Sequence, residues 1–213
     1  MLREYSIAGP EHRLGLFEIG LFEYYLDDGE KRIANMIEAE NDAIDEYSRR
    51  DVEYNDTSMT AVQYFEKRIR YSHIIYLNTL LEKCLKEGCA RIKDTVGLQE
   101  IPFNWTELKG NSWEQCTKCL KVYAKVEIED SQKEKIRTLS DIRNNIVHDG
   151  GSVDESFANR ISGVAGLRIR SAEIHIDGQY VRDMLEIVKS IAEKIDHEIT
   201  KIEDRILKPE LNI

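Results

Sequence analysis

The chain has 213 residues, of which 41% are hydrophobic and 33% are charged, and its formal net charge is −10. This composition excludes a protein embedded in a membrane and a disordered chain, and the length fits one domain with its own core. The net negative charge argues against a broad electrostatic surface for nucleic acid, because neutralising phosphates takes clustered Lys and Arg. No apolar run approaches the roughly 18 residues of a membrane span, so we expect a cytoplasmic protein with no membrane partner.

Helical spacing of apolar residues dominates the first half of the chain. It predicts a helix over residues 11–27, which Asp28-Gly29 ends or bends, and a second helix over 30–50 with an acidic outer face. After a polar linker, a long helix is predicted over 59–87. We expect Gly88 to terminate it and an irregular segment to follow.

The second half of the chain continues the helical pattern with one interruption. Capping-box residues predict one helix over 112–125 and another that begins at Ser131 and ends at 149–151. The alternating run at 167–177 predicts a short hairpin or extended excursion, and a long apolar stripe predicts a last helix over 180–207. The expected fold is therefore all-α, a bundle of long antiparallel helices with this excursion before the last helix.

Four cysteines allow two interpretations. Cys116 and Cys119 form a Cys-x-x-Cys pair, which zinc or redox sites also use, but together with Leu120 and Tyr123 they follow the spacing of a helix that faces a core. Cys84 lies on the apolar stripe of an earlier helix, so we favour buried free thiols. None of the five histidines has the spacing of a metal ligand pair, and we expect neither a metal nor another cofactor.

The stretch from Asp141 to Gly151 gathers polar residues near the end of a predicted helix. Asn144 and His148 are four residues apart and share one face, and Asp141 lies a further turn back on nearly the same stripe. The long side chain of Arg143 can reach the same region. Three apolar residues are expected to form the buried side: Ile142, Ile146 and Val147.

The chemistry of this cluster suits cleavage of an RNA phosphodiester without a metal ion. His148 can accept or donate a proton near neutral pH, Arg143 can stabilise charge on phosphate oxygens, and Asn144 can orient His148 or bind the substrate. These three are the catalytic candidates. Five further residues are candidates for substrate binding: Asp141, Asn145, His73, Arg168 and Arg170. For His73 the alternative is a hydrogen-bonded core residue, which is the commoner role of a lone His on an apolar helix.

The spacing of Arg143 and His148 resembles the Arg-x4-His motif of the HEPN superfamily (higher eukaryotes and prokaryotes nucleotide-binding domains), in particular its prokaryotic stand-alone members. The resemblance covers 59–207, so we expect a single helical domain over 1–213 in which 1–50 is an N-terminal helical extension packed on a HEPN-like core. It implies a metal-independent endoribonuclease that forms a homodimer, with the two motif helices facing each other in one composite site on RNA.

The resemblance also implies a cellular role and leaves alternatives open. Members act as toxins or in antiviral defence, which makes an antitoxin or defence-system protein a possible partner, and others bind RNA, a nucleotide or a protein as non-catalytic dimeric modules. One subgroup carries a Tyr two residues after the His, where this chain has Gly150, so neutralisation through that Tyr is not expected. Without any such function, Arg and His near a glycine cap are ordinary helix-ending residues.

Overall fold

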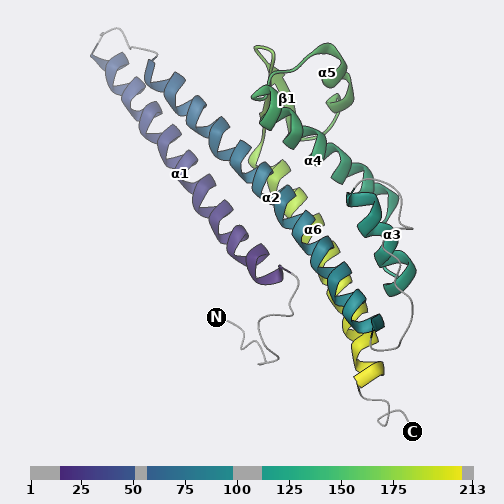
Figure 1. Ribbon diagram of the computed structural model, residues 1–213. Helices are drawn as coiled ribbons and strands as arrows, with labels where there is room; N and C mark the ends of the chain where they lie inside the picture. Colours follow the sequence, from purple (N-terminus) through teal and green to yellow (C-terminus); the bar gives the residue numbers. More distant parts are fainter. Residues whose placement is uncertain (1–14, 51–56, 98–111, 208–213) are drawn as a thin grey trace. The chain divides into compact units, whose positions relative to one another are not determined.

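The computed structural model describes residues 15–50, 57–97 and 112–207 of the chain, and its fold is all-α, as predicted (Figure 1). A single antiparallel hairpin precedes the last helix, which confirms the expected excursion. No helix in the described ranges is long and apolar enough to cross a membrane. The elements in chain order are α1 (Leu16–Arg49), α2 (Thr57–Gly97), α3 (Ser112–Ala124), α4 (Asp130–Asp149), α5 (Glu155–Ile161), β1 (Leu167–Arg170), β2 (Glu173–Ile176) and α6 (Gly178–Leu207).

Two predicted helix ends are wrong, because both α1 and α2 continue through a glycine. At Gly29 a Cβ atom would lie 2.9 Å from Cε1 of His73, and at Gly88 it would lie 2.7 Å from a methyl group of Ile195. Both glycines therefore allow close packing inside a helix rather than ending one. The irregular segment expected after Gly88 is helical as far as Gly97, and its remainder lies outside the described residues, as do the linker at 51–56 and the predicted helix start at 11–14.

The start of α4 and the loop after it also differ in detail from the prediction. The helix begins at Asp130, one residue before the expected capping residue Ser131, and the Gln132 side chain accepts a hydrogen bond from the Glu129 backbone N–H at 3.3 Å. This is the return bond of a capping box, displaced by two residues. The short helix α5 was not predicted, although its N-cap, Asp154, accepts a bond from the Phe157 backbone N–H at 2.7 Å.

The described residues divide into two compact units that alternate along the sequence. The first unit contains the residues up to Ile19, those of 79–132 and those from Ile187 onwards, and the second contains 20–78 and 133–186. The boundary at residue 50 that we expected between an extension and a core does not separate these units, because α1 supplies buried residues such as Ile19 and Leu26 to both.

The first unit encloses an apolar core and all four cysteines. All four side chains are buried and none forms a disulfide, as the preferred interpretation predicts, and burial raises the pKa of Cys84 to about 12. Arg91 of α2 fastens α6 with two ion pairs, to Asp196 at 2.6 Å and to Glu203 at 2.7 Å. Arg91 therefore joins the two helices outside the apolar contact.

The second unit contains α4, α5 and the hairpin, and a charged cluster ties its parts together. Arg70 of α2 contacts Glu30 of α1 through two nitrogens, at 2.9 and 3.1 Å, and donates to the backbone carbonyl of Ile176 in β2 at 3.1 Å. Arg70 also pairs with Glu66 one turn earlier on its own helix. One guanidinium thus links two helices and the hairpin, whose turn residues Ser171 and Ala172 adopt left-handed backbone angles.

Candidate functional site

The candidate site lies in the second unit, at the C-terminal end of α4. The helix ends at Asp149, and Gly150 and Gly151 follow with φ of +65° and +90°, which confirms the predicted glycine cap and places His148 in the last turn. The backbone N–H of Ser152 donates to the carbonyl of Asp149 at 3.0 Å. The chain turns sharply here and leaves the last turn of α4 open to solvent.

The loop after α4 is fixed from two directions. Gly151 packs so closely on the ring and hydroxyl of Tyr71 that a Cβ atom would overlap them, and its carbonyl accepts from the Ile174 N–H of β2 at 2.9 Å. Tyr71 in turn donates its hydroxyl hydrogen to the Ile174 carbonyl at 2.7 Å. The end of the motif helix is therefore held by α2 and by the hairpin at the same point.

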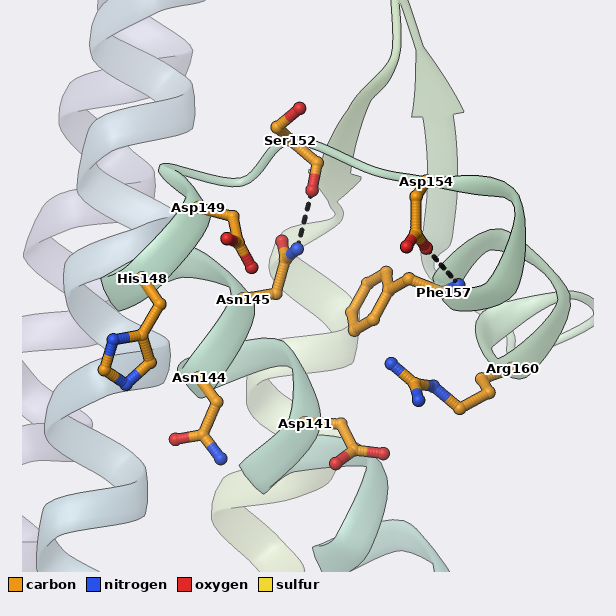
Figure 2. Close-up of a pocket in the computed structure, with 9 residues that line it drawn as sticks. All are labelled: Asp141, Asn144, Asn145, His148, Asp149, Ser152, Asp154, Phe157 and Arg160. Atoms are coloured by element: carbon orange, nitrogen blue, oxygen red, sulfur yellow. Dashed lines mark hydrogen bonds between the residues drawn. The ribbon is translucent and has the colours of Figure 1, made fainter.

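A pocket of about 490 Å³ opens beside this helix end (Figure 2). Of the predicted residues, the structure brings Asp141, Asn144 and His148 of α4 together on its wall, as their spacing on one helix face requires, and Asn145 joins them. The remaining wall comes from the last residue of α4, from the loop after it and from α5. Its residues are Asp149, Ser152, Asp154, Phe157 and Arg160.

Arg143 is attached to this cluster without lining the pocket. Its side chain is half-buried, and Nη1 donates a hydrogen bond to Oδ1 of Asn144 at 2.9 Å, so the guanidinium reaches round to the motif face as expected. Its Nε is buried and has no hydrogen-bond partner among the described residues. The amide oxygen of Asn144 is therefore engaged by Arg143.

His148 is exposed, and its imidazole makes no hydrogen bond to any residue in the described parts of the chain. No hydrogen bond joins Asn144 to His148 within the described residues, and the amide oxygen of Asn144 accepts from Arg143, so the orientation of His148 by Asn144 stays a prediction. Both ring nitrogens of His148 are consequently free to exchange protons with a bound molecule.

Asn145 contributes to the site by positioning the loop. Its side chain is buried, and Nδ2 donates to the backbone carbonyl of Ser152 at 2.6 Å (Figure 2). Its backbone carbonyl accepts from the N–H of Gly151 at 3.4 Å. We predicted a contact with substrate at this residue, whereas the structure gives its amide to the turn that follows the motif.

His73 is a core residue, and it does not line the pocket. Its ring packs edge-on against Phe22 and Tyr25, with centroid distances of 5.8 and 5.1 Å, and neither nitrogen has a hydrogen-bond partner in the part of the chain that the structure describes. Burial lowers the pKa of His73 to about 4, so the ring is neutral at the pH of a cell. A fully buried ring cannot touch a substrate, which corrects the prediction that His73 binds one.

Arg168 and Arg170 lie on β1, and the pocket wall does not include them. They stand opposite His175 and Glu173 in the hairpin register, and Arg168 forms an ion pair with Asp177. Burial lowers the pKa of His175, and the positive charge of Arg170 lowers it further. The sequence prediction of substrate binding at these arginines stays a prediction.

The residues that sequence reasoning missed come mainly from the loop and α5. Phe157 is buried on the pocket wall, and the guanidinium of Arg160 lies over its ring at 5.2 Å (Figure 2). The sequence did carry a signal for α5, because the N-cap residue Asp154 precedes apolar Phe157 and Ile161 at a spacing of four. The excursion predicted over 167–177 did not include this segment.

The electrostatic character of the wall is acidic. Its residues include three carboxylates, one guanidinium and the imidazole of His148. No group of three or more His, Cys, Asp or Glu side chains in the described ranges could hold a metal ion. No model of a protein family, no curated protein and no solved structure matches the chain.

Proposed function

We propose that the chain is a metal-independent endoribonuclease of the HEPN type. The observation that carries the proposal is the arrangement at the end of α4. The exposed His148 lies one turn beyond Asn144 and lines an open pocket. Asn144 accepts a hydrogen bond at its Oδ1 from Nη1 of Arg143 at 2.9 Å. An acid–base group and a permanent cation at one exposed point are what transfer of an RNA phosphodiester bond requires.

The proposed reaction uses the RNA's own ribose as nucleophile. The 2′-oxygen forms a bond to the adjacent phosphorus while the bond from phosphorus to the 5′-oxygen breaks, which leaves a 2′,3′-cyclic phosphate and a free 5′-hydroxyl. His148 accepts the proton of the 2′-hydroxyl or gives one to the departing 5′-oxygen. Arg143 stabilises the charge that builds on the phosphate oxygens.

A single histidine does not serve as base and acid in one turnover, and this requirement makes a homodimer part of the proposal. In it, Arg143, Asn144 and His148 of both chains line one groove on the RNA. Two arginines in a small volume would also supply local positive potential on a protein whose net charge is −10. A toxin or antiviral effector, restrained by an antitoxin or defence-system protein, is the cellular role that fits such an activity.

Cleavage of RNA in the presence of EDTA tests the proposal. We expect products with 2′,3′-cyclic phosphate ends, and we expect Arg143→Ala and His148→Ala each to lower the rate at least about a hundredfold, the usual contribution of a positioned acid or base. Arg137→Ala on the same helix and His197→Ala on α6 are matched controls, because both residues are exposed and neither lines the pocket. Full cleavage by the two motif variants would refute the assignment.

The second candidate function is a non-catalytic dimeric module that binds RNA, a nucleotide or a protein. The three carboxylates of the pocket favour the protein-binding form of this module, because they repel a phosphate that enters deeply. Tight binding of RNA by the purified wild-type protein, without any cleaved product, would support this module over the enzyme.

A further inference from the structure

The pocket beside His148 offers an excess of free hydrogen-bond acceptors. Asp141 and Asp149 are exposed on its wall, and neither carboxylate has an ion pair or hydrogen bond to another residue of the described chain. Asp154, the third carboxylate, uses one oxygen to cap α5. An anion is therefore disfavoured inside this pocket, whereas a neutral group that carries several N–H donors finds partners there.

The same pocket holds a flat, supported surface. The exposed guanidinium of Arg160 lies 5.2 Å from the ring centre of Phe157, which is itself 4% exposed, so the ring fixes the arginine from beneath (Figure 2). Unstacked bases of single-stranded RNA stack on guanidinium planes as well as on aromatic rings. The volume of about 490 Å³ lies within the range of small-molecule sites and accommodates one base.

The chemistry of these two features selects among the four bases. Guanine presents two adjacent donors on its Watson–Crick edge, N1–H and the N2 amino group, and a carboxylate accepts both at once. Adenine and cytosine offer an amino group next to a ring acceptor, which a carboxylate repels, and uracil offers a single N–H between two acceptors. Among the bases of RNA, guanine therefore matches the wall of Asp141 and Asp149.

We propose that this pocket is a recognition subsite for a guanine base of single-stranded RNA. The base stacks on Arg160, and its Watson–Crick edge donates to one of the two carboxylates, Asp141 or Asp149, which stand about 12 Å apart along α4. The inference rests on the proposed function, since His148 and Asn144 line the same pocket. In this arrangement the acidic wall selects the base, and Arg143 of each chain holds the phosphate.

Binding of RNA that cannot be cleaved tests the subsite. The probes are fluorescein-labelled oligouridines in which every ribose is 2′-O-methylated and one central residue is guanosine, adenosine, cytidine or inosine. Fluorescence anisotropy with the full-length protein should show the guanosine probe binding about tenfold more tightly than the others, the discrimination expected of one bidentate base contact. Inosine lacks the N2 amino group, so its affinity should fall between those of guanosine and adenosine.

Variants of the two carboxylates complete the test. We expect Asp141→Asn or Asp149→Asn to reduce the preference for guanosine, according to which carboxylate binds the base, and the double variant to abolish it. Glu155→Gln is the matched control, because it removes the same charge from the first turn of α5, is exposed and does not line the pocket. Far-ultraviolet circular dichroism should show an unchanged helix content, since both aspartates are exposed. Equal affinity for all four probes, or a preference that survives the double variant, would overturn the inference.

Cleavage of the same oligonucleotides with a free 2′-hydroxyl separates this inference from the proposed function. A guanosine preference in binding without any cleavage would support the subsite and refute the ribonuclease. Cleavage without any base preference would support the ribonuclease and refute the subsite.

Discussion

Two consecutive glycines follow the helix that carries His148, and they differ in their surroundings. Both have positive φ, at +65° for Gly150 and +90° for Gly151, but only Gly151 lies against another side chain, that of Tyr71. A Cβ at Gly150 would meet nothing within 4 Å. The pair therefore separates the effect of backbone conformation from the effect of close packing.

We predict that Gly151→Ala destabilises the protein much more than Gly150→Ala. A left-handed conformation costs a non-glycine residue about 1 kcal/mol, and a methyl group forced against Tyr71 adds about 2 kcal/mol. Urea unfolding of the two variants measures both free energies. Equal losses of stability would show that Tyr71 does not constrain this turn.

Single residues also show how far a sequence can define a site. The shared face of Asp141, Asn144 and His148 follows from helix geometry, and the structure places all three on one wall. The role of Asn145 was not predictable, because its partner is a backbone carbonyl whose position depends on the fold of the loop. The burial of His73 likewise depends on a neighbouring helix that its own sequence does not specify.

Between elements, Arg70 makes the contact that we expect to matter most. It joins α1, α2 and the hairpin, and its side chain and that of Glu30 are 14% and 17% exposed. Removing one partner of a largely buried pair leaves the other charge without compensation. Arg70→Ala should therefore lower the free energy of unfolding by about 2 kcal/mol, less than a fully buried pair would lose.

Arg32→Ala is the matched control for this variant. Arg32 pairs with Asp28 on α1, at 2.7 Å, and the two side chains are 72% and 42% exposed. An exposed pair one helical turn apart contributes about 0.5 kcal/mol or less. If thermal unfolding gave the two variants the same loss, the Arg70 cluster would have no special role in holding these elements.

The lengths of α1 and α2 mark a limit of prediction for elements. Local rules make glycine a helix terminator, and they predicted ends near Gly29 and at Gly88. Each glycine instead meets a side chain from a distant part of the sequence, His73 or Ile195, and this packing compensates for the low helix propensity. The helix α4, its glycine cap and the hairpin carry clear local signals, and those predictions are confirmed apart from the first residue of α4.

For the whole molecule, the proposed dimer makes a specific demand on α4. Of the residues expected on its apolar side, Ile142 and Ile146 are buried, but Val147, next to His148, is 48% exposed. In a two-fold dimer with facing motif helices, such a residue lies at or near its own counterpart. An apolar side chain there fits an interface, and a charged one would face a like charge.

We therefore predict that Val147→Lys weakens the dimer at least about tenfold and lowers ribonuclease activity in proportion. Light scattering coupled to size-exclusion chromatography, across a range of protein concentrations, measures the equilibrium. Val122→Lys is the control, because Val122 is 56% exposed on α3 in the other unit. A monomeric wild-type protein that still cleaves RNA would contradict the composite site.

The two hydrogen bonds of Ile174 allow the opening of the loop beside the site to be measured in solution. This fully buried residue donates its N–H to the carbonyl of Gly151, and its own carbonyl accepts from the hydroxyl of Tyr71, so one residue of the hairpin contacts both the loop after α4 and α2. Amide hydrogen exchange at Ile174 depends on how often this arrangement opens. Its rate reports on the loop that supports His148 from a position that no ligand touches.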